Sequence, residues 1–396
     1  MSAAPGSVRR PTFVLAAGGT GGHLFPAQAL AERLVGRGAA VCLATDRRAE
    51  AFVEEVRGAE EVPGSVPMPG IEIRQIRAGR LGGPLQSARG VAAMAVGLVQ
   101  ARRLLRRLDP AAVVGFGGYP SVPTLLAANQ LGFPTVIHEQ NAVLGRANRL
   151  LAARVQRIAT GFADTALLRP ADRARATYTG NPVRPAIGAL AHIGYHPPEP
   201  GAPLELLILG GSQGARIFAE IVPPALAACP PALRAALRVS QQARREDCAR
   251  VAMEFEAAGI AGEVRSFLTD VPERLARAQL VLCRAGASTV SELAAMGRPA
   301  LLVPYPHATD DHQAANARAF AAAGAGWVIP QSQLSAPMLA KILTERLADP
   351  AGLADAAAQA HRFACDDAAE RLTTIVLALV PGMAGKADGK PRECAA

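Results

Sequence analysis

The sequence predicts an α/β protein with two doubly wound, Rossmann-like parallel-sheet domains in tandem. Three observations predict this class: the chain length, an alternation of short apolar runs with amphipathic segments, and a glycine motif that occurs twice. The 396 residues exceed the roughly 250–300 residues at which single cores stop growing. Hydrophobic residues make up 50% of the chain and aromatic ones only 4%, so alanine, leucine and valine must fill the cores.

Short apolar runs predict buried parallel strands. In the first half they are TFVLAA, AAVCLAT, AAVVGF, FPTVIHE and RVQRIAT, beginning at residues 12, 39, 111, 133 and 154. In the second half they are LELLILG, LRVSQQ, GEVRSF, LVLCRAG and PALLVPY, beginning at residues 204, 237, 262, 280 and 299. The amphipathic segments between them are expected to be the crossover helices that join parallel strands.

The motif GG[ST]xG follows the first apolar run of each half, at residues 18–22 and 210–214. Between the two halves, residues 180–203 are rich in proline and glycine and cannot continue a helix or a central strand. We therefore expect a first domain over 11–182, a linker over 183–203 and a second domain over 204–362. A C-terminal helix over 363–380 is expected to pack back on the first domain, followed by a disordered tail over 381–396.

The first glycine loop predicts an anion site, because a strand that ends in glycines and opens a helix presents free backbone N–H groups. Glycine also permits close approach of a ligand. Dinucleotide binding is one alternative, and Asp46 at the end of the next run would suit the ribose. The spacing argues against it, because GxGxxG from Gly19 requires glycine where Leu24 stands. A tight turn that only packs strand on helix is the other alternative.

His23 follows these glycines, on the first turn of the expected helix. Ligands of open α/β sheets bind at this carboxyl edge. The helix N-terminus disfavours an imidazolium, so we expect a neutral ring that can accept a proton. The alternative is a capping or core histidine.

Residues 280–306 predict a second ligand site, where a strand ends and a small-residue turn leads to a helix. Thr289 and Glu292 fit T-x-x-E, which predicts a capping box. The functional alternative is that the amides of Ser288 and Thr289 hold a phosphate while Glu292 faces a ribose diol. The second glycine motif offers another amide cradle, with Ser212 as hydroxyl donor. Two cradles and an acid suit a nucleoside diphosphate sugar.

Asp310, Asp311 and Gln313 follow the next strand, where they could bind sugar hydroxyls. The alternative for the two aspartates is N-capping, and we expect at least one of them to do only that. No further carboxylate or histidine stands at a metal-ligand spacing, so no metal site is expected. The six cysteines form no CxxC pair, which favours buried thiols over a zinc site or a disulfide framework.

The net charge of +9 predicts an anionic partner. Residues 71–110 hold eight arginines against Glu72 and Asp109, and each basic group near an anionic leaflet contributes roughly 1 kcal/mol. The predicted membrane contacts are Arg77, Arg80, Leu81, Leu85 and Arg89. The apolar stripe that follows is expected to be core: Met94, Leu98, Ala101, Leu105 and Leu108.

The sequence argues against nucleic acid as the anionic partner and against a membrane-inserted segment. Nucleic acid is not expected as a partner, because no aromatic residues interleave with these arginines. The first apolar run, about six residues long, leads directly into the glycines, so we expect no signal peptide. No run approaches the roughly 18–20 apolar residues of a membrane span, which predicts a cytosolic or peripheral protein.

The motifs together resemble one family. GGTGGHLFPA, GFGGYPSVP, HEQNAVLGRANR, TGNPVR, GGSQGAR and CRAGASTVSELAAMGRPALLVPYPHATDDHQAANA stand in the order found in the bacterial UDP-GlcNAc:undecaprenyl-diphospho-muramoylpentapeptide N-acetylglucosaminyltransferases. These enzymes turn lipid I into lipid II in peptidoglycan synthesis. The resemblance runs from about Phe13 to about Phe363, and GGYPSVP varies the family's third glycine-rich loop.

The resemblance implies a GT-B fold, with UDP-GlcNAc mainly on the second domain and lipid I on the first. It implies that His23 is the general base on the acceptor's C4 hydroxyl, in an inverting displacement without metal or cofactor. It places the protein peripherally on the cytoplasmic face of the inner membrane, with anionic lipids and proteins of cell-wall synthesis as partners. It also implies these donor contacts: Thr20, Gly21, Gly22, Asn141, Arg184, Ser212, Leu268, Ala287, Ser288, Thr289, Val290, Ser291, Glu292 and Gln313.

The sequence leaves two other functions open. The first is another GT-B enzyme, such as a diacylglycerol glycosyltransferase or a UDP-GlcNAc 2-epimerase. The epimerase would need carboxylates and histidines around the anomeric centre and no membrane face. An NAD(P)-linked oxidoreductase or a binding protein of the same fold is the other, against which the missing GxGxxG argues.

Overall fold

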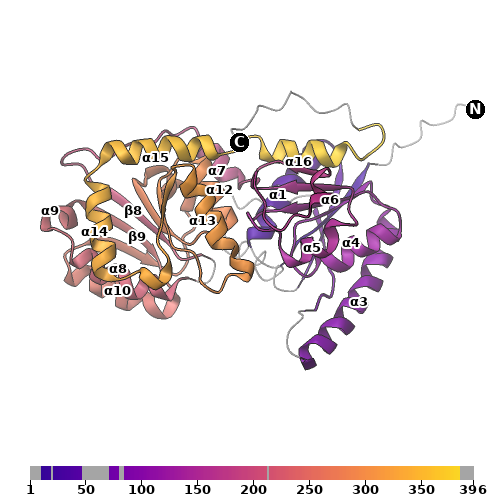
Figure 1. Ribbon diagram of the computed structural model, residues 1–396, viewed down its shortest axis with the longest axis horizontal. Helices are drawn as coiled ribbons and strands as arrows, with labels where there is room; N and C mark the ends of the chain where they lie inside the picture. The colour runs from indigo at the N-terminus through magenta and orange to yellow at the C-terminus, as the bar shows by residue number, and fades with distance from the viewer. Residues whose placement is uncertain (1–9, 19–20, 47–70, 80–83, 212–213, 384–396) are drawn as a thin grey trace, which may run out of the picture.

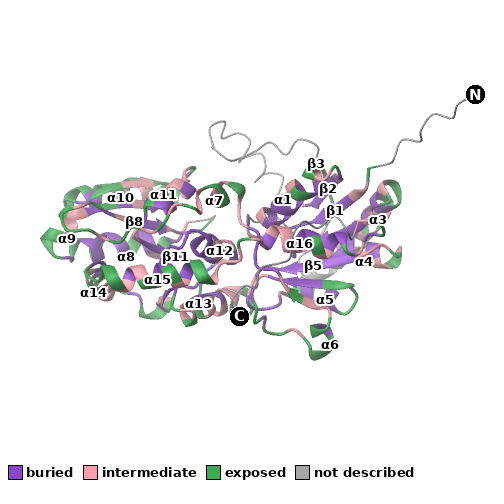
Figure 2. Cartoon of the chain, turned by 90° about the horizontal axis from the view of Figure 1, so that it is seen from above, coloured by how far each residue is buried: buried purple, intermediate pink, exposed green. Residues whose placement is uncertain are grey.

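The computed structural model describes residues 10–18, 21–46, 71–79, 84–211 and 214–383. Within these ranges the chain forms two parallel sheets, one in each half, with the buried strands at the centre of each domain (Figures 1 and 2). The predicted fold class is confirmed. The tail that we expect to be disordered lies outside the described residues from position 384 on.

The first domain has a seven-stranded sheet in the order β3-β2-β1-β4-β5-β6-β7. Alternate residues of β1 face opposite layers: Phe13 and Leu15 belong to the core under α1, and Val14 and Ala16 to the core under α3 and α4. The elements are β1 Thr12–Ala16, α1 Gly21–Gly36, β2 Ala40–Thr45, β3 Ile71–Gln75, α3 Pro84–Leu108, β4 Ala112–Gly115, α4 Ser121–Gln130, β5 Thr135–Glu139, α5 Arg146–Ala152, β6 Arg157–Thr160, α6 Pro170–Arg173 and β7 Ala176–Tyr178.

The second domain has a six-stranded sheet in the order β10-β9-β8-β11-β12-β13. Its β8 pairs with β9 on one side and β11 on the other, as β1 pairs with β2 and β4. In both sheets the order of the strands therefore reverses at the first strand of the domain. The elements are β8 Leu204–Leu209, α8 Arg216–Ala227, α9 Pro231–Ala236, β9 Leu237–Gln242, α10 Arg245–Ala257, β10 Ala261–Arg265, α11 Val271–Arg277, β11 Leu280–Cys283, α12 Ala287–Ala295, β12 Ala300–Leu302, η1 Thr309–Asp311, α13 His312–Ala322, β13 Gly326–Val328, η2 Gln331–Gln333, α14 Ala336–Leu347 and α15 Pro350–Phe363.

The chain crosses between the domains twice, at neighbouring places. The segment after β7 leads into α7 (Pro185–Leu190) and the second domain, and the C-terminal helix α16 (Ala368–Leu377) returns to the first domain. Figure 1 shows α15 over the second domain and α16 over the first. Gly180 lies against Cys365 at this double crossing, where a Cβ would stand 2.4 Å from the Cys365 Cβ. Only glycine fits there, since its φ is also +73°.

Helix α16 is part of the first domain's core. Its Leu372 and Val376 are fully buried among the side chains of β1 and α1, and Arg37 after α1 forms a 2.5 Å ion pair with Glu370. The α3 stripe predicted to be core is confirmed. Ala101 and Leu105 are fully buried, and Met94, Leu98 and Leu108 pack against the same core.

Candidate active site

His23 lies on the first turn of α1, beside the loop that follows β4. A Cβ on Gly117 would stand 3.2 Å from the His23 Cε1, and one on Gly118 would stand 3.5 Å from its Cδ2. The same loop contacts the first glycine motif, because a Cβ on Gly118 would stand 2.7 Å from the Gly18 Cα. Glycine at both places therefore lets two loops meet around one imidazole ring.

The environment of His23 favours its neutral form. Burial lowers the pKa of the ring below its usual 6.5, while a hydrogen bond to Gln140 and the nearby Glu139 carboxylate oppose that shift. His312 of the second domain lowers the pKa, and the Phe116 carbonyl raises it. A ring that is neutral near pH 7 can accept a proton.

Glu139 organises the loop after β5. Its buried carboxylate accepts four hydrogen bonds: from the Asn141 N–H (3.0 Å) and side-chain amide (3.1 Å), the Gly145 N–H (2.8 Å) and the Asn148 side chain (2.8 Å). Of this loop, the sequence motifs indicated only Asn141. His138, Glu139, Gln140 and Asn148 were missed, although buried polar residues at the end of an apolar strand are themselves a signal of a site.

The two domains meet at Asn316 on α13. Its side chain accepts a 2.8 Å hydrogen bond from the Ala142 N–H and donates to the Asn141 side-chain oxygen at 3.1 Å. Asn141 therefore links Glu139 to the second domain in this structure. At the edge of the same boundary, Arg149 on α5 donates a 2.6 Å hydrogen bond to Asp310.

Helix α12 faces α1 across the boundary between the domains. A Cβ on Gly22 would stand 3.8 Å from the Ser288 hydroxyl oxygen, which is buried and has no hydrogen-bond partner among the described residues. Two helix N-termini thus approach the same point with a free hydroxyl between them. Such an arrangement can hold a doubly charged diphosphate.

The predicted capping box at Thr289 and Glu292 is wrong. Helix α12 begins at Ala287 after an N-cap at Gly286, without a side-chain cap, so both residues lie inside the helix. Glu292 instead accepts two hydrogen bonds from Arg184, at 2.7 and 2.8 Å. Ser291 is one turn from α12's start and accepts a 3.1 Å hydrogen bond from Asn181 of the first domain.

The predicted N-cap role of Asp310 or Asp311 is met in position alone. Asp311 stands at the N-cap position of α13 but makes no side-chain cap hydrogen bond, and both aspartates have left-handed backbone angles near +54°. Asp310 pairs with Arg149, and Arg146 lies 3.5 Å away from it. Gln313 accepts a 2.9 Å hydrogen bond from the Tyr305 N–H.

The other predicted donor contacts divide into two groups. Leu268, Ala287 and Val290 are buried in the second domain's core, so only their backbone can reach a ligand. Thr20 and Ser212 lie outside the described residues, whereas Gly21 and Gly22 begin α1. The structure therefore brings the N-terminus of α1, His23 and the N-terminus of α12 together.

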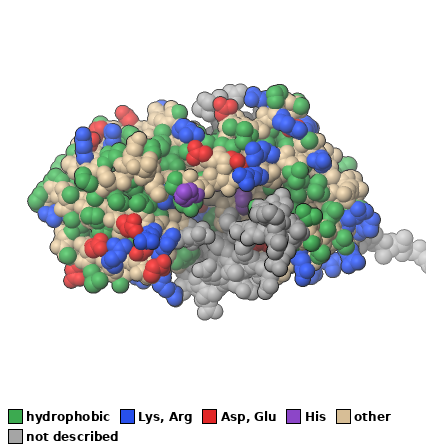
Figure 3. Space-filling view, turned by 60° about the horizontal axis from the view of Figure 1, so that its bottom comes forward, with side chains coloured by type: hydrophobic (Ala, Val, Ile, Leu, Met, Phe, Trp, Pro, Cys, Tyr) green, Lys and Arg blue, Asp and Glu red, His purple; other side chains and the backbone are tan. Residues whose placement is uncertain are grey.

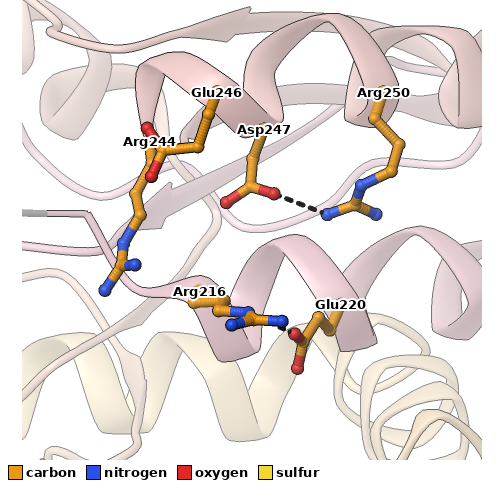
Figure 4. A pocket seen from close by; sticks show the side chains of 6 residues that line it. All are labelled: Arg216, Glu220, Arg244, Glu246, Asp247 and Arg250. Atoms are coloured by element: carbon orange, nitrogen blue, oxygen red, sulfur yellow. Dashed lines mark hydrogen bonds and ion pairs between the residues drawn. The ribbon is translucent and has the colours of Figure 1, made fainter.

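A separate cavity of about 360 Å³ lies between α8 and α10 (Figure 4). The side chains that line it carry both positive and negative charges. Asp247 forms a 2.9 Å ion pair with Arg250, and Glu220 forms a 2.7 Å ion pair with Arg216. None of the predicted site residues lines it. Figure 3 shows histidine side chains elsewhere, at the hollow where the two domains meet.

The two Rossmann-like domains meet at a glycine loop, a neutral histidine and a pair of helix N-termini. This arrangement defines a glycosyltransferase of the GT-B class. The glycosyltransferase family 28 N-terminal domain matches residues 13–160, and the family 28 C-terminal domain matches residues 205–372. The chain belongs to this family, and within it to the UDP-N-acetylglucosamine--N-acetylmuramyl-(pentapeptide) pyrophosphoryl-undecaprenol N-acetylglucosamine transferases.

Individual relatives agree with this assignment. The transferase of that name from Rhodospirillum centenum is 52% identical over 379 residues, which cover 96% of each chain. A crystal structure of Acinetobacter baumannii MurG matches with a TM-score of 0.71 and 29% identity, over 92% of this chain and 99% of that one. CalG4, the calicheamicin glycosyltransferase, matches with a TM-score of 0.62 at 18% identity, over 95% of this chain and 100% of that one, which shows the shared fold.

Proposed function

We propose that this N-acetylglucosamine transferase moves GlcNAc from UDP-GlcNAc to the C4 hydroxyl of MurNAc in undecaprenyl-diphospho-MurNAc-pentapeptide, lipid I. The product is lipid II for peptidoglycan synthesis. The observation that carries the proposal is the position of His23, a neutral base at the point where the N-termini of α1 and α12 face each other.

The reaction is a direct displacement at the anomeric carbon. The C4 oxygen attacks from the face opposite the UDP, so the configuration inverts, and its proton passes to His23. The leaving diphosphate gains negative charge, which the amides at the start of α12 and the Ser288 hydroxyl stabilise. A positioned base of this kind contributes about 10²–10⁴-fold to the rate.

Donor recognition falls mainly to the second domain. Glu292 and Gln313 bind the ribose and the GlcNAc hydroxyls, and the Leu268 backbone binds the uracil. From the first domain and the linker, Gly21, Gly22, Asn141 and Arg184 complete the site. Thr20 and Ser212, which the proposal also assigns to the donor, lie outside the described residues.

Lipid I is a membrane lipid, and we place the membrane contact at α3. No helix within the described ranges has both the length and the apolar character to span a bilayer. Helix α3 extends from the first domain (Figure 1) and exposes Val91, Val96 and Val99 by 60%, 41% and 49%. Exposed arginines, among them Arg103 and Arg106, follow on the same helix. Apolar residues beside basic ones suit the surface of an anionic leaflet.

The predicted membrane contacts lie in or before the first part of α3. Leu85 and Arg89 lie in the N-terminal part of α3, and Arg77 is exposed just before it, whereas Arg80 and Leu81 lie outside the described residues. The exposed valines were not predicted from the sequence, because the apolar stripe of α3 that packs in the core accounts for most of the helix's apolar residues.

The proposed activity is tested with UDP-[14C]GlcNAc and a short-chain lipid I analogue, for the wild type and for His23→Ala. We expect label transfer by the wild type and a loss of about 10²-fold or more in the variant, with UDP-GlcNAc binding kept. Release of free UDP-ManNAc, or transfer to diacylglycerol and not to lipid I, would reject the proposed acceptor.

A further inference from the structure

A chain of hydrogen bonds runs from the domain crossing to His23. The His138 Nε2 lies 3.2 Å from the Gly180 carbonyl oxygen. The Gln140 Nε2 lies 3.0 Å from the His138 Nδ1 and 3.1 Å from the His138 carbonyl oxygen. The Gln140 Oε1 lies 3.0 Å from the His23 Nδ1.

The two carbonyl oxygens at one end determine the direction of every donor in this chain. Since a carbonyl oxygen only accepts, the His138 Nε2 must carry a proton toward Gly180. The neutral His138 ring then has its lone pair on Nδ1, which accepts from the Gln140 amide. The same amide group donates to the His138 carbonyl, so its nitrogen must face His138 and its oxygen must face His23.

His23 therefore meets an acceptor at Nδ1. A neutral ring that donates from Nδ1 has its lone pair on Nε2, the nitrogen away from Gln140. In water the neutral imidazole of histidine prefers the opposite tautomer, with the proton on Nε2. Without this series of hydrogen bonds, most His23 side chains would carry their proton on Nε2, which is the nitrogen that has to accept one.

We propose that Gln140, oriented by His138 and the Gly180 carbonyl, is a positioning residue that fixes His23 as the Nδ1–H tautomer and leaves Nε2 as the proton acceptor. The inference rests on the proposed role of His23 as general base. The burial of these hydrogen bonds supports the proposal. His138 is fully buried and Gln140 is 2% exposed, so water does not compete for the hydrogen bonds of either side chain.

The groups that face His23 come from several elements. They are Glu139 at the end of β5, His138 within β5, His312 at the start of α13 and the Phe116 carbonyl after β4. The carboxylate of Glu139 has its four partners in the loop of residues 141–148, so Gln140 is the side chain that accepts from the His23 Nδ1.

The first test is the tautomer itself, measured by ¹⁵N NMR of the histidine-labelled full-length protein at neutral pH. The His23→Gln variant identifies the His23 signals among those of the seven histidines. We expect a protonated Nδ1 and an unprotonated Nε2 in the wild type, and a shift toward protonated Nε2 in Gln140→Ala. A wild-type ring protonated at Nε2 would overturn the proposal.

The second test is kinetic. Gln140→Ala should lower kcat by about 10- to 100-fold, less than loss of the base itself, with KM for UDP-GlcNAc within about twofold. Gln140→Leu keeps the approximate size of the side chain but has no acceptor for the His23 Nδ1, so it should lower kcat like Gln140→Ala. An unchanged kcat in Gln140→Ala or in Gln140→Leu would overturn the proposal.

Gln156→Ala is the matched control. Gln156 accepts a 3.0 Å hydrogen bond from the Thr135 N–H, at the opposite end of β5, so its loss disturbs the same strand away from His23. We expect near wild-type kcat from this control. A wild type that has the Nδ1–H tautomer but transfers nothing to lipid I would reject the proposed function and leave the tautomer assignment standing.

Discussion

The guanidinium of Arg184 holds the carboxylate of Glu292 through two parallel hydrogen bonds, Nε to Oε1 at 2.7 Å and Nη2 to Oε2 at 2.8 Å. Arg184 also stands 5.0 Å from the centre of the Phe25 ring on α1. It thus connects the linker, the helix of the proposed base and the helix of the proposed donor site. Both members of the pair are expected donor contacts, so UDP-GlcNAc has to share or replace their bonds.

Glu292→Gln should weaken donor binding and reduce stability. The amide cannot accept both arginine bonds, and it leaves a half-buried cation without its counter-charge. We expect the Kd of UDP-GlcNAc to rise about tenfold and the free energy of unfolding to fall by about 1–3 kcal/mol. Calorimetric titration and urea unfolding measure the two effects. Glu345→Gln, which removes an exposed 3.9 Å ion pair with Lys341, should change neither. Equal donor affinity in both variants would contradict the assignment.

Gly118→Ala should be far more damaging than Gly132→Ala, although both residues have φ near +76°. The Gly118 Cβ would stand 2.7 Å from the Gly18 Cα, whereas nothing lies within 4 Å of a Cβ on Gly132. We expect about 1 kcal/mol lost at Gly132, with activity kept, because only the backbone angle is strained. At Gly118 we expect about 2–4 kcal/mol and most of the activity to be lost, since the loops around His23 must separate. Thermal unfolding measures the loss of stability, and the transfer assay measures the loss of activity. Equal effects of the two substitutions would contradict the close approach of Gly118 to Gly18.

The central strands and one edge strand, β10, could be predicted from the sequence, and the other three edge strands could not. Every apolar run identified as a strand forms one. The central strands were found because strands buried on both faces need continuous apolar residues. The unpredicted strands β3, β7 and β13 all lie at sheet edges. Edge strands bury less, and β3 alternates exposed residues such as Glu72 and Arg74 with half-buried isoleucines. Their pairing is decided by neighbours that a local pattern does not contain.

The candidate site divides in a similar way. The glycine loop, His23 and the α12 turn could be found from their places after strands, because parallel strands end at one edge of the sheet. The Thr289 capping box was wrong because the N-cap of the helix is Gly286, three residues before Thr289, which frees Glu292 for Arg184. Gln140 could not be assigned from local sequence, since its partner His23 is 117 residues away.

The stability of the protein should depend on pH through His138. Burial lowers the pKa of this ring to about 4, against the Gly180 hydrogen bond, which raises it. The unfolded ring titrates near its usual 6.5, so between pH 6.5 and 4 the unfolded chain binds a proton that the folded chain does not. The free energy of unfolding must therefore fall as pH falls through this window, by up to about 3 kcal/mol from this group.

Urea unfolding at several values between pH 7 and 4 measures this dependence, for the wild type and for His138→Gln. The variant has no ring to titrate, so its free energy of unfolding should fall less steeply across the window. His192→Gln serves as the control, since that histidine lies on the linker away from the hydrogen-bond chain. Parallel curves for the wild type and His138→Gln would show that His138 is not held neutral by burial.

Replacing Val91, Val96 and Val99 by serine should release the protein from membranes while catalysis survives. Their exposed side chains on α3 would enter the lipid surface, and losing three such contacts should weaken vesicle binding about tenfold or more. Sedimentation with phosphatidylglycerol vesicles measures the binding, and transfer to a water-soluble lipid I analogue should stay within about twofold. Met253→Ser removes a side chain that is 62% exposed on the second domain and should bind vesicles like the wild type. Unchanged binding by the triple variant would place the membrane contact elsewhere on the first domain.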